Sequence, residues 1–114
     1  MNRTHSLKRH KEFRYTYRVG KSVGSHLFSL VWAKNRLDAV KIGFSVSKRV
    51  GNSVQRNRAK RRLRACITPM IASIRRGTNL IFVARKDVLT VPFAQMQQQM
   101  RDVLLRAGLM ENDA

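Results

Sequence analysis

Acidic residues are scarce in this sequence. Of its 114 residues only six are Asp or Glu, against 24 Lys and Arg, which leaves a net charge of +18. Between Asp38 and Asp87 there is no acidic residue, whereas thirteen basic residues occur there. Self-repulsion on this scale destabilises a compact state unless an anion neutralises it. We therefore expect a polyanionic partner, with nucleic acid as the first candidate and an anionic membrane as the second.

Long apolar runs and cysteine pairs are also absent. No segment approaches the ~18 apolar residues of a membrane span, and residues 1–11 lack the apolar stretch of a secretory signal, so we expect a cytoplasmic protein with no membrane partner. Cys66 is the single cysteine, which excludes an intrachain disulfide, and its apolar neighbours at helical spacing indicate a buried, inert thiol. One cysteine and three widely separated histidines offer no zinc-ligand spacing. We expect no metal site and no tightly bound cofactor.

The apolar content is nonetheless sufficient for a folded domain. Apolar residues make up 43% of the chain, more than a disordered polycation would carry. A chain of 114 residues can build one hydrophobic core but not two. We therefore expect a single domain over residues 1–114.

The first half of the chain has the pattern of a helix followed by strands. Residues 6–18 are expected to form a helix that Gly20 closes in the left-handed conformation. Alternation in residues 27–32 and 40–47 predicts two strands, each with an apolar face and a face of smaller or hydroxylated residues. We expect these two strands to pair as an antiparallel hairpin. Residues 21–26 favour a further short strand.

The second half predicts a helix, a strand and a helix. An amphipathic pattern over residues 54–75 indicates a long helix, capped by Asn52 or Ser53, in which Pro69 should kink the helix or end it early. The continuous apolar run 80–84 predicts a buried strand. The last helix is expected to present a core face made by Phe93, Met96, Met100, Val103 and Ala107. This order of elements suggests an α+β sandwich in which helices cover one sheet.

The most informative segment is the basic run 48–64. Eight of its seventeen residues are basic and none is acidic. Arginine pairs with phosphate bidentately, so we interpret the polar side of the expected helix as a surface for structured RNA. The alternative is a solvated helix face, which usually carries both signs of charge. The residues expected on this polar side are Asn57, Arg58, Lys60, Arg61, Arg62 and Arg64.

The same segment resembles the "RNR" signature of the bacterial ribonuclease P protein family. The signature residues here are Arg56, Asn57 and Arg58, with Lys48, Arg49 and Gly51 before them and Lys60, Arg61 and Arg64 after them. Further matching positions are Leu7, Lys8, Phe13, Tyr17, Gly20, the run 43–48 and the run 82–85. The resemblance therefore extends in order over nearly the whole chain.

The resemblance implies both a fold and a function. The fold would be a two-layer α/β sandwich of αβββαβα type, with a mixed, mainly antiparallel four-stranded sheet. Its βαβ crossover would be left-handed, against the general preference for right-handed crossovers. The function would be that of the non-catalytic protein subunit of an endoribonuclease, ribonuclease P. Its partners would be the catalytic RNA subunit, which uses Mg²⁺ to remove the 5′ leader, and precursor tRNA, with no obligate protein partner.

By the same resemblance, two groups of residues bind RNA. The surface facing the catalytic RNA would comprise Lys48, Arg49, Arg56, Asn57, Arg58, Lys60, Arg61 and Arg64. The cleft for the single-stranded leader, between the first helix and the sheet, would be lined by Phe13, Tyr17, Ser29, Val31, Lys60 and Arg61. Aromatic rings stack on splayed bases without reading sequence, and a cationic groove follows the backbone. The alternative for Phe13 and Tyr17 is an ordinary core-facing pair.

The chain's own residues offer no convincing catalytic centre. Its six acids are scattered outside the basic segment, whereas a metal-dependent nuclease gathers carboxylates around its ions. His5, His10 and His26 show no pairing of an acid with a base. A ribosomal or other structural RNA-binding protein is the alternative function, because it would share the size, charge and α+β build. A DNA reader is less favoured, since no helix-turn-helix or zinc pattern occurs.

Overall fold

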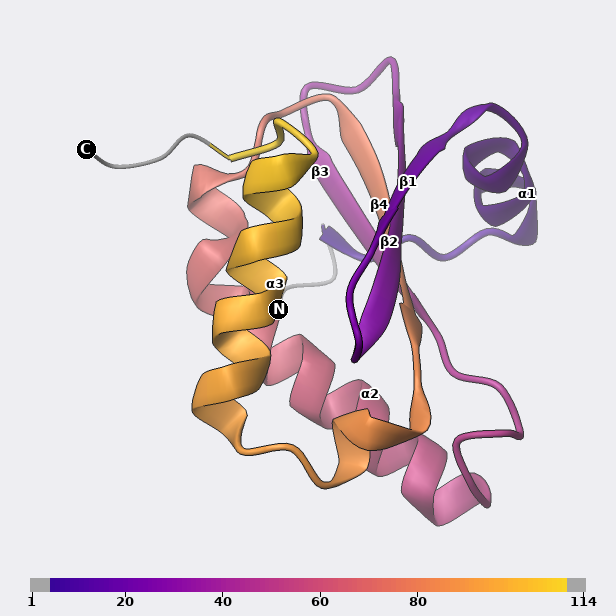
Figure 1. Ribbon diagram of the computed structural model, residues 1–114. Helices are drawn as coiled ribbons and strands as arrows, with labels where there is room; N and C mark the ends of the chain where they lie inside the picture. The colour runs from indigo at the N-terminus through magenta and orange to yellow at the C-terminus, as the bar shows by residue number, and fades with distance from the viewer. Residues whose placement is uncertain (1–4, 111–114) are drawn as a thin grey trace.

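Helices lie on both faces of a four-stranded sheet in the computed structural model, which describes residues 5–110 (Figure 1). In chain order the elements are α1 (His10–Val19), β1 (Lys21–Gly24), β2 (Phe28–Lys34), β3 (Val40–Ser45), α2 (Ser53–Ile67), β4 (Thr78–Ala84) and α3 (Phe93–Arg106). Short 3-10 segments, η2 (Thr68–Ser73) and η3 (Lys86–Leu89), follow α2 and β4. The expected αβββαβα order is confirmed, although α1 begins at His10 and not near residue 6.

The strands form one mixed sheet in the order β1-β2-β4-β3. β2 is antiparallel to both β1 and β4, whereas β3 is parallel to β4, to which α2 connects it. The expected hairpin of β2 with β3 is therefore wrong, because β4 lies between them. β4 is also the most buried strand, with six of its seven residues buried. A strand that is apolar on both faces is favoured at the centre of a sheet that is covered on both sides.

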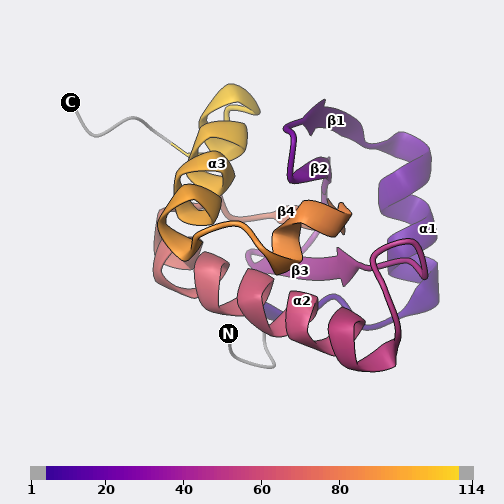
Figure 2. The ribbon, with the colours of Figure 1, turned by 60° about the horizontal axis from the view of Figure 1, so that its bottom comes forward.

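The main hydrophobic core lies between the sheet and the helices α2 and α3, which cover one face (Figure 2). The rings of Phe28 and Phe82 meet there edge to face, with their centroids 5.5 Å apart. The sheet, α2 and α3 form the expected two-layer sandwich, and α1 adds a partial third layer on the opposite face. Met96, Met100 and Val103 of α3 are buried as expected, but Phe93 is 38% exposed, so its place in the core was predicted wrongly.

The ends of α2 follow directly from its sequence. The Asn52 side chain accepts a hydrogen bond from the backbone N–H of Gln55 (2.9 Å), and the Gln55 side chain accepts one from the N–H of Asn52 (2.9 Å). This capping box satisfies two of the N–H groups that a helix start leaves free. Pro69 has no N–H and cannot continue the helix, so α2 ends at Ile67 and the chain turns into η2. The early end expected from Pro69 is confirmed.

Two glycines allow α1 to pack directly on the sheet. Gly20 is extended (φ −76°, ψ 158°), not left-handed as expected. It is required by close approach, because a Cβ there would lie 2.8 Å from the carbonyl oxygen of Trp32. A Cβ on Gly43 of β3 would overlap the ring of Phe13 and lie 2.8 Å from its Cε1. Phe13 therefore covers Gly43 and joins the middle of α1 to the sheet.

A buried polar chain joins α1 to β4 as well. Asn79 is 5% exposed, and its Nδ2 donates to the hydroxyl of the fully buried Thr16 (3.2 Å). Thr16 Oγ1 in turn donates to the carbonyl of Glu12 (2.8 Å), and Asn35 Nδ2 donates to Asn79 Oδ1 (2.9 Å). Because buried polar groups are costly when unpaired, this network favours one position of α1 on the sheet.

The packing of α1 on the sheet can be tested by substituting two glycines of the strands. We expect Gly43→Ala to destabilise the protein by ~1–3 kcal/mol, the usual cost of inserting a group into a packed site. Gly24→Ala is the matched control, because a Cβ there would have its nearest neighbour at 3.8 Å, on Ser29 Oγ. It should change the free energy of unfolding by less than about 0.5 kcal/mol. Urea unfolding of the full chain measures both, and equal losses would contradict the packing of Phe13 on Gly43.

Candidate nucleic-acid interface

The α2 basic surface consists of the residues at α2 and the turn before it that were expected to face RNA. They are Lys48, Arg49, Arg56, Asn57, Arg58, Lys60, Arg61 and Arg64. Arg56 and Lys60 are half-buried and the other six are exposed. No ion pair joins any of them to a carboxylate within residues 5–110. The positive charge of this surface is therefore uncompensated within the described chain, which favours attraction of a polyanion.

Arg56 and Arg58 lie on different flanks of α2. Residues two apart on an α-helix project about 200° apart, so the two guanidinium groups cannot hold one phosphate together. Arg56 is half-buried, and its Nη2 donates to Ser53 Oγ (3.3 Å) while its Nε is buried without a partner. Arg58 is exposed, and Asn57 between them is exposed too. The surface thus wraps around the helix and offers contacts to several phosphates.

Arg62 does not belong to this surface, contrary to the sequence-based expectation. Its Nη1 donates to the carbonyl of Val88 and its Nη2 to the carbonyl of Val91, both at 2.6 Å. The side chain therefore holds η3 and the segment just before α3 against α2. Nothing in the spacing of the basic residues distinguishes Arg62 from its neighbours, because the difference lies in carbonyl groups that are distant in the sequence.

Cys66 is buried in the same helix and has no exposed surface. Burial raises the pKa of its thiol to about 12, although the charge of Arg62 acts in the opposite direction. Because the thiolate is the reactive form of cysteine, this side chain is unreactive near neutral pH. The expectation of a buried, inert thiol is confirmed.

The face of the sheet that carries α1 is only partly covered. Val83 of β4 lies opposite Ser29 of β2 and beside Ser45 of β3 in the strand register, so the three residues form a row across the sheet. All three are half-buried. In the next row, Ile81 and Gly43 are buried beneath α1. The row Ser29–Val83–Ser45 is therefore the least covered of these rows, and we call it the cleft floor after the expected leader cleft.

The structure places the expected cleft residues in different surroundings. Ser29 lies on the cleft floor, and Val31 lies one row further along, half-buried near the end of α1. Phe13 is half-buried over Gly43, whereas Tyr17 is 45% exposed. Phe13 therefore matches the core-facing alternative better than Tyr17 does. Both residues come from α1, which borders the cleft floor.

Lys60 and Arg61 are carried by α2, on the other side of the sheet from α1 (Figure 2). Their place in the cleft stays a prediction. The turn between β3 and α2, which contains Lys48 and Arg49, passes round the end of the sheet toward the side of α1 (Figure 1). Those two exposed cations are therefore carried toward the same side as the cleft floor.

Sequence reasoning missed two residues of the cleft floor. Val83 lies in the continuous apolar run of β4, where every position is apolar and no alternation shows which face it takes. Ser45 lies on the small, hydroxylated face that alternation predicted for residues 40–47, so a signal for it was available. Both were identified only through the pairing of β3 and β2 with β4.

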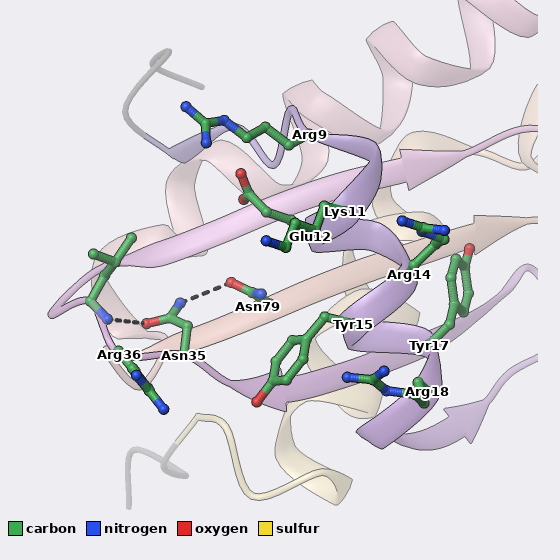
Figure 3. A pocket seen from close by; sticks show the side chains of 11 residues that line it. Arg9, Lys11, Glu12, Arg14, Tyr15, Tyr17, Arg18, Asn35, Arg36 and Asn79 are labelled. Atoms are coloured by element: carbon green, nitrogen blue, oxygen red, sulfur yellow. Dashed lines mark hydrogen bonds between the residues drawn. The ribbon is translucent and has the colours of Figure 1, made fainter.

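A second hollow, of about 1070 Å³, lies along the outer side of α1 and reaches the loop after β2 (Figure 3). We call it the α1 outer pocket. Its lining includes two tyrosines and five basic side chains, which are Tyr15, Tyr17, Arg9, Lys11, Arg14, Arg18 and Arg36. No sequence pattern pointed to this pocket, because its walls come from three separate segments: α1, the loop after β2 and the start of β4.

The acidic residues of the described chain do not assemble into a site. Within residues 5–110 no three His, Cys, Asp or Glu side chains gather in a way that could hold a metal ion. Asp38 pairs with Arg76 (3.5 Å) and Asp102 pairs with Arg106 (2.9 Å). Two more of the scattered acids, Glu111 and Asp113, lie outside the described residues. No helix in the described part of the chain has the length and apolar character needed to cross a membrane.

Comparisons with known proteins point to one family. Residues 1–108 match the family model described as Ribonuclease P. The chain is 35% identical over 111 residues to the ribonuclease P protein component of Chloroflexus aggregans, covering 96% of this chain and 82% of that protein. It is 30% identical over 114 residues to that of Symbiobacterium thermophilum, with 99% of each chain covered. The solved RNase P protein of Staphylococcus aureus superposes with a TM-score of 0.83 at 29% identity, covering 94% of this chain and 98% of that one.

The structural role of Arg62 can be separated from RNA binding by a stability measurement. Arg62→Ala removes two hydrogen bonds from a charged donor, so we expect a loss of about 1.5–3 kcal/mol in the free energy of unfolding. The adjacent Arg61 is exposed, and Arg61→Ala should stay within about 0.5 kcal/mol of the parent. Chemical denaturation of the two variants gives the comparison. Similar stabilities would mean that the Arg62 contacts contribute nothing to the fold.

Proposed function

The chain belongs to the ribonuclease P protein family, and from this premise we propose that it binds the RNA subunit of ribonuclease P and the 5′ leader of precursor tRNA. The coarser role, a protein component of an endoribonuclease ribonucleoprotein, follows from the family itself. A ribosomal protein, the alternative that size and charge left open, is not supported by any of these relatives. Processing of precursor tRNA in bacteria would take place in the cytoplasm.

The α2 basic surface would bind the RNA subunit. Its support is an arc of exposed Arg and Lys side chains on a helix that Ala59, Leu63 and Cys66 attach to the core. A rigid helix holds cations at fixed positions, and phosphate contacts of this kind set the orientation of a protein on RNA without reading bases. Arg56 and Arg58 on opposite flanks would contact phosphates of different backbone segments.

The observation that best supports binding of the leader is the cleft floor beside α1. Small side chains at Ser29 and Ser45 leave space for a strand, and their hydroxyl groups can donate to it or accept from it. Tyr17 on the bordering helix presents an exposed ring, and aromatic rings bind unstacked bases of any sequence. A single-stranded leader of variable sequence is a ligand with these properties.

We assign the chemistry of cleavage to the RNA subunit. The described acids are dispersed, and two of them are engaged with arginines, so these residues of the chain do not fit a magnesium site. Mg²⁺ would then be held by RNA. The chain would contribute by positioning the leader and by neutralising phosphate charge, with no catalytic residue of its own.

The assembly role of the α2 basic surface predicts a change in salt dependence. Arg56→Ala combined with Arg58→Ala should weaken binding to the RNA subunit while the fold stays intact. The logarithm of affinity should also fall less steeply with the logarithm of salt, by ~0.7 for each lost single-strand-like contact. Arg75→Ala with Arg76→Ala removes the same charge elsewhere and should have a smaller effect. If the two pairs behave alike, net charge and not this surface governs assembly.

The leader cleft predicts a difference between two forms of tRNA. Tyr17→Ala should weaken holoenzyme binding to precursor tRNA, because base–aromatic stacking is worth ~1–3 kcal/mol, or about tenfold in affinity per 1.4 kcal/mol. Mature tRNA has no leader, so its affinity should stay nearly unchanged. Phe13→Ala is a less specific test, since Phe13 also packs on Gly43.

Val19→Ala is the control for this experiment, because Val19 is 51% exposed and lies on another side of α1. Equal losses for precursor and mature tRNA in Tyr17→Ala would contradict the leader cleft.

In a cleavage assay, the chain with magnesium ions but without the RNA subunit should leave precursor tRNA uncut. Cleavage there that disappears on changing one acid or histidine would assign the chemistry to the protein.

A further inference from the structure

The α1 outer pocket lies at the end of the sheet opposite the cleft floor. Its wall includes Asn79, at the start of β4, and Asn35, just after the end of β2. The cleft floor lies at the other ends of these strands, at Val83 and Ser29. A base stacked on Tyr15 would therefore lie away from the cleft floor, although Tyr17, the aromatic residue assigned to the leader, lines this pocket as well.

Tyr15 offers a flat, oriented surface in this pocket. Its side chain is 40% exposed, and its hydroxyl donates to the carbonyl of Lys34 (3.3 Å). This hydrogen bond ties the ring to the end of β2 and leaves part of it open. Figure 3 shows the ring of Tyr15 between α1 and the loop that carries Asn35 and Arg36. An exposed ring held in this way can take a stacked base.

Positive charge surrounds the same space. Five basic side chains line the pocket against one acid, Glu12. Within the described residues none of the five forms an ion pair. Arg18 comes from α1 and Arg36 from the loop, so cations stand on both sides of the ring of Tyr15, whereas Arg14 lies beside Tyr17. Guanidinium groups in this position can bind the phosphates that flank a stacked base.

The floor and loop of the pocket are fixed before any ligand binds. Asn35 Oδ1 accepts from the backbone N–H of Leu37 (2.9 Å), and Asn35 Nδ2 donates to Asn79 Oδ1 (2.9 Å). The backbone N–H of Asn35 donates to the carbonyl of Gly77 (2.8 Å). Because these bonds already hold the loop, little ordering is needed on binding, and such preorganisation raises affinity.

We propose that the α1 outer pocket is a second site for single-stranded RNA, in which a base stacks on Tyr15 while Arg18 and Arg36 bind the adjacent phosphates. The amide groups of Asn35 and Asn79 are engaged with each other, so the pocket accepts a base by stacking and does not select its identity. The strand comes either from leader nucleotides far from the cleavage site or from an unpaired segment of the RNA subunit.

The site can be tested on the full chain with a short single-stranded oligoadenylate, followed through backbone amide NMR signals. The oligonucleotide should shift the signals of the loop 35–37, and Tyr15→Ala should raise the Kd fitted to those signals by about fivefold or more, as expected for a lost stacking contact. Tyr15→Phe keeps the ring and loses only the hydrogen bond to Lys34, so it should bind more tightly than Tyr15→Ala. The Kd fitted at Ser29, Ser45 and Val83 should not change in either variant.

Arg36 supplies an independent variant, because its exposed side chain makes no hydrogen bond with other described residues that its loss could disturb. Arg36→Ala should weaken binding at the loop and lower the salt slope there by ~0.7, whereas Arg75→Ala, outside the pocket, should do neither. The proposal is overturned if the loop signals do not move. It is also overturned if Tyr15→Ala and Arg36→Ala bind as the parent does, or if inorganic phosphate alone reproduces the shifts.

A second measurement distinguishes the two sources of the strand. If the pocket binds leader nucleotides far from the cleavage site, Tyr15→Ala should weaken holoenzyme binding to precursor tRNA that has a long leader. Binding to precursor tRNA that has a short leader should stay unchanged. If it takes a segment of the RNA subunit, the same variant should weaken assembly whatever the leader length. An unchanged affinity in all three assays would refute a role for the pocket in the holoenzyme. Failure of the leader cleft would appear separately, as an absence of oligonucleotide shifts at Ser29, Ser45 and Val83, none of which lines the pocket.

Discussion

The burial of β4 on both faces is the constraint on which the rest of the structure depends. Leu80 and Phe82 face the core beneath α2 and α3, whereas Asn79, Ile81 and Val83 face the side of α1. Because both faces must be covered, β4 takes the centre of the sheet and β2 and β3 pair on its two edges. The parallel pairing with β3 requires a crossover, and α2 provides it. The helix α2, which carries six of the 24 basic residues, is therefore also an indispensable connection of the fold.

The position of α1 decides how much of the sheet is available to a ligand. Gly20 and Gly43 bring the helix close to the strands, and the Thr16–Asn79 hydrogen bond fixes it over β4. The helix covers the middle rows of the sheet and leaves the cleft floor at one end and the α1 outer pocket at the other. A net charge of +18 is then distributed over surfaces on both sides of the sheet. Such a distribution suits a protein that contacts more than one strand of RNA, because each surface can neutralise a different backbone.

The outcome for individual residues shows which structural features a local sequence pattern can predict. Asn52 was expected to cap α2 and does so, and Pro69 was expected to end it and does so, because caps and proline effects depend only on neighbouring residues. Arg62 was grouped with the basic surface, yet it binds carbonyl groups about thirty residues away. Phe93 was placed in the core by its helical spacing, and the hairpin of β2 and β3 by their proximity in sequence. Both were wrong because the packing partners belong to distant segments.

The sequence by itself determined the order of helices and strands, the family, and the basic helix that is expected to meet RNA. Each of these depends on residue type and short-range spacing, which can be read from the sequence without knowledge of the fold. Only the tertiary structure decided which strands are neighbours, which basic side chains are engaged internally, and which residues of the sheet stay open. Val83 and Tyr15 illustrate the difference. The role of each depends on where α1 lies on the sheet. That position results from the contact of Phe13 with Gly43 and the hydrogen bond of Asn79 to Thr16, between residues far apart in the chain.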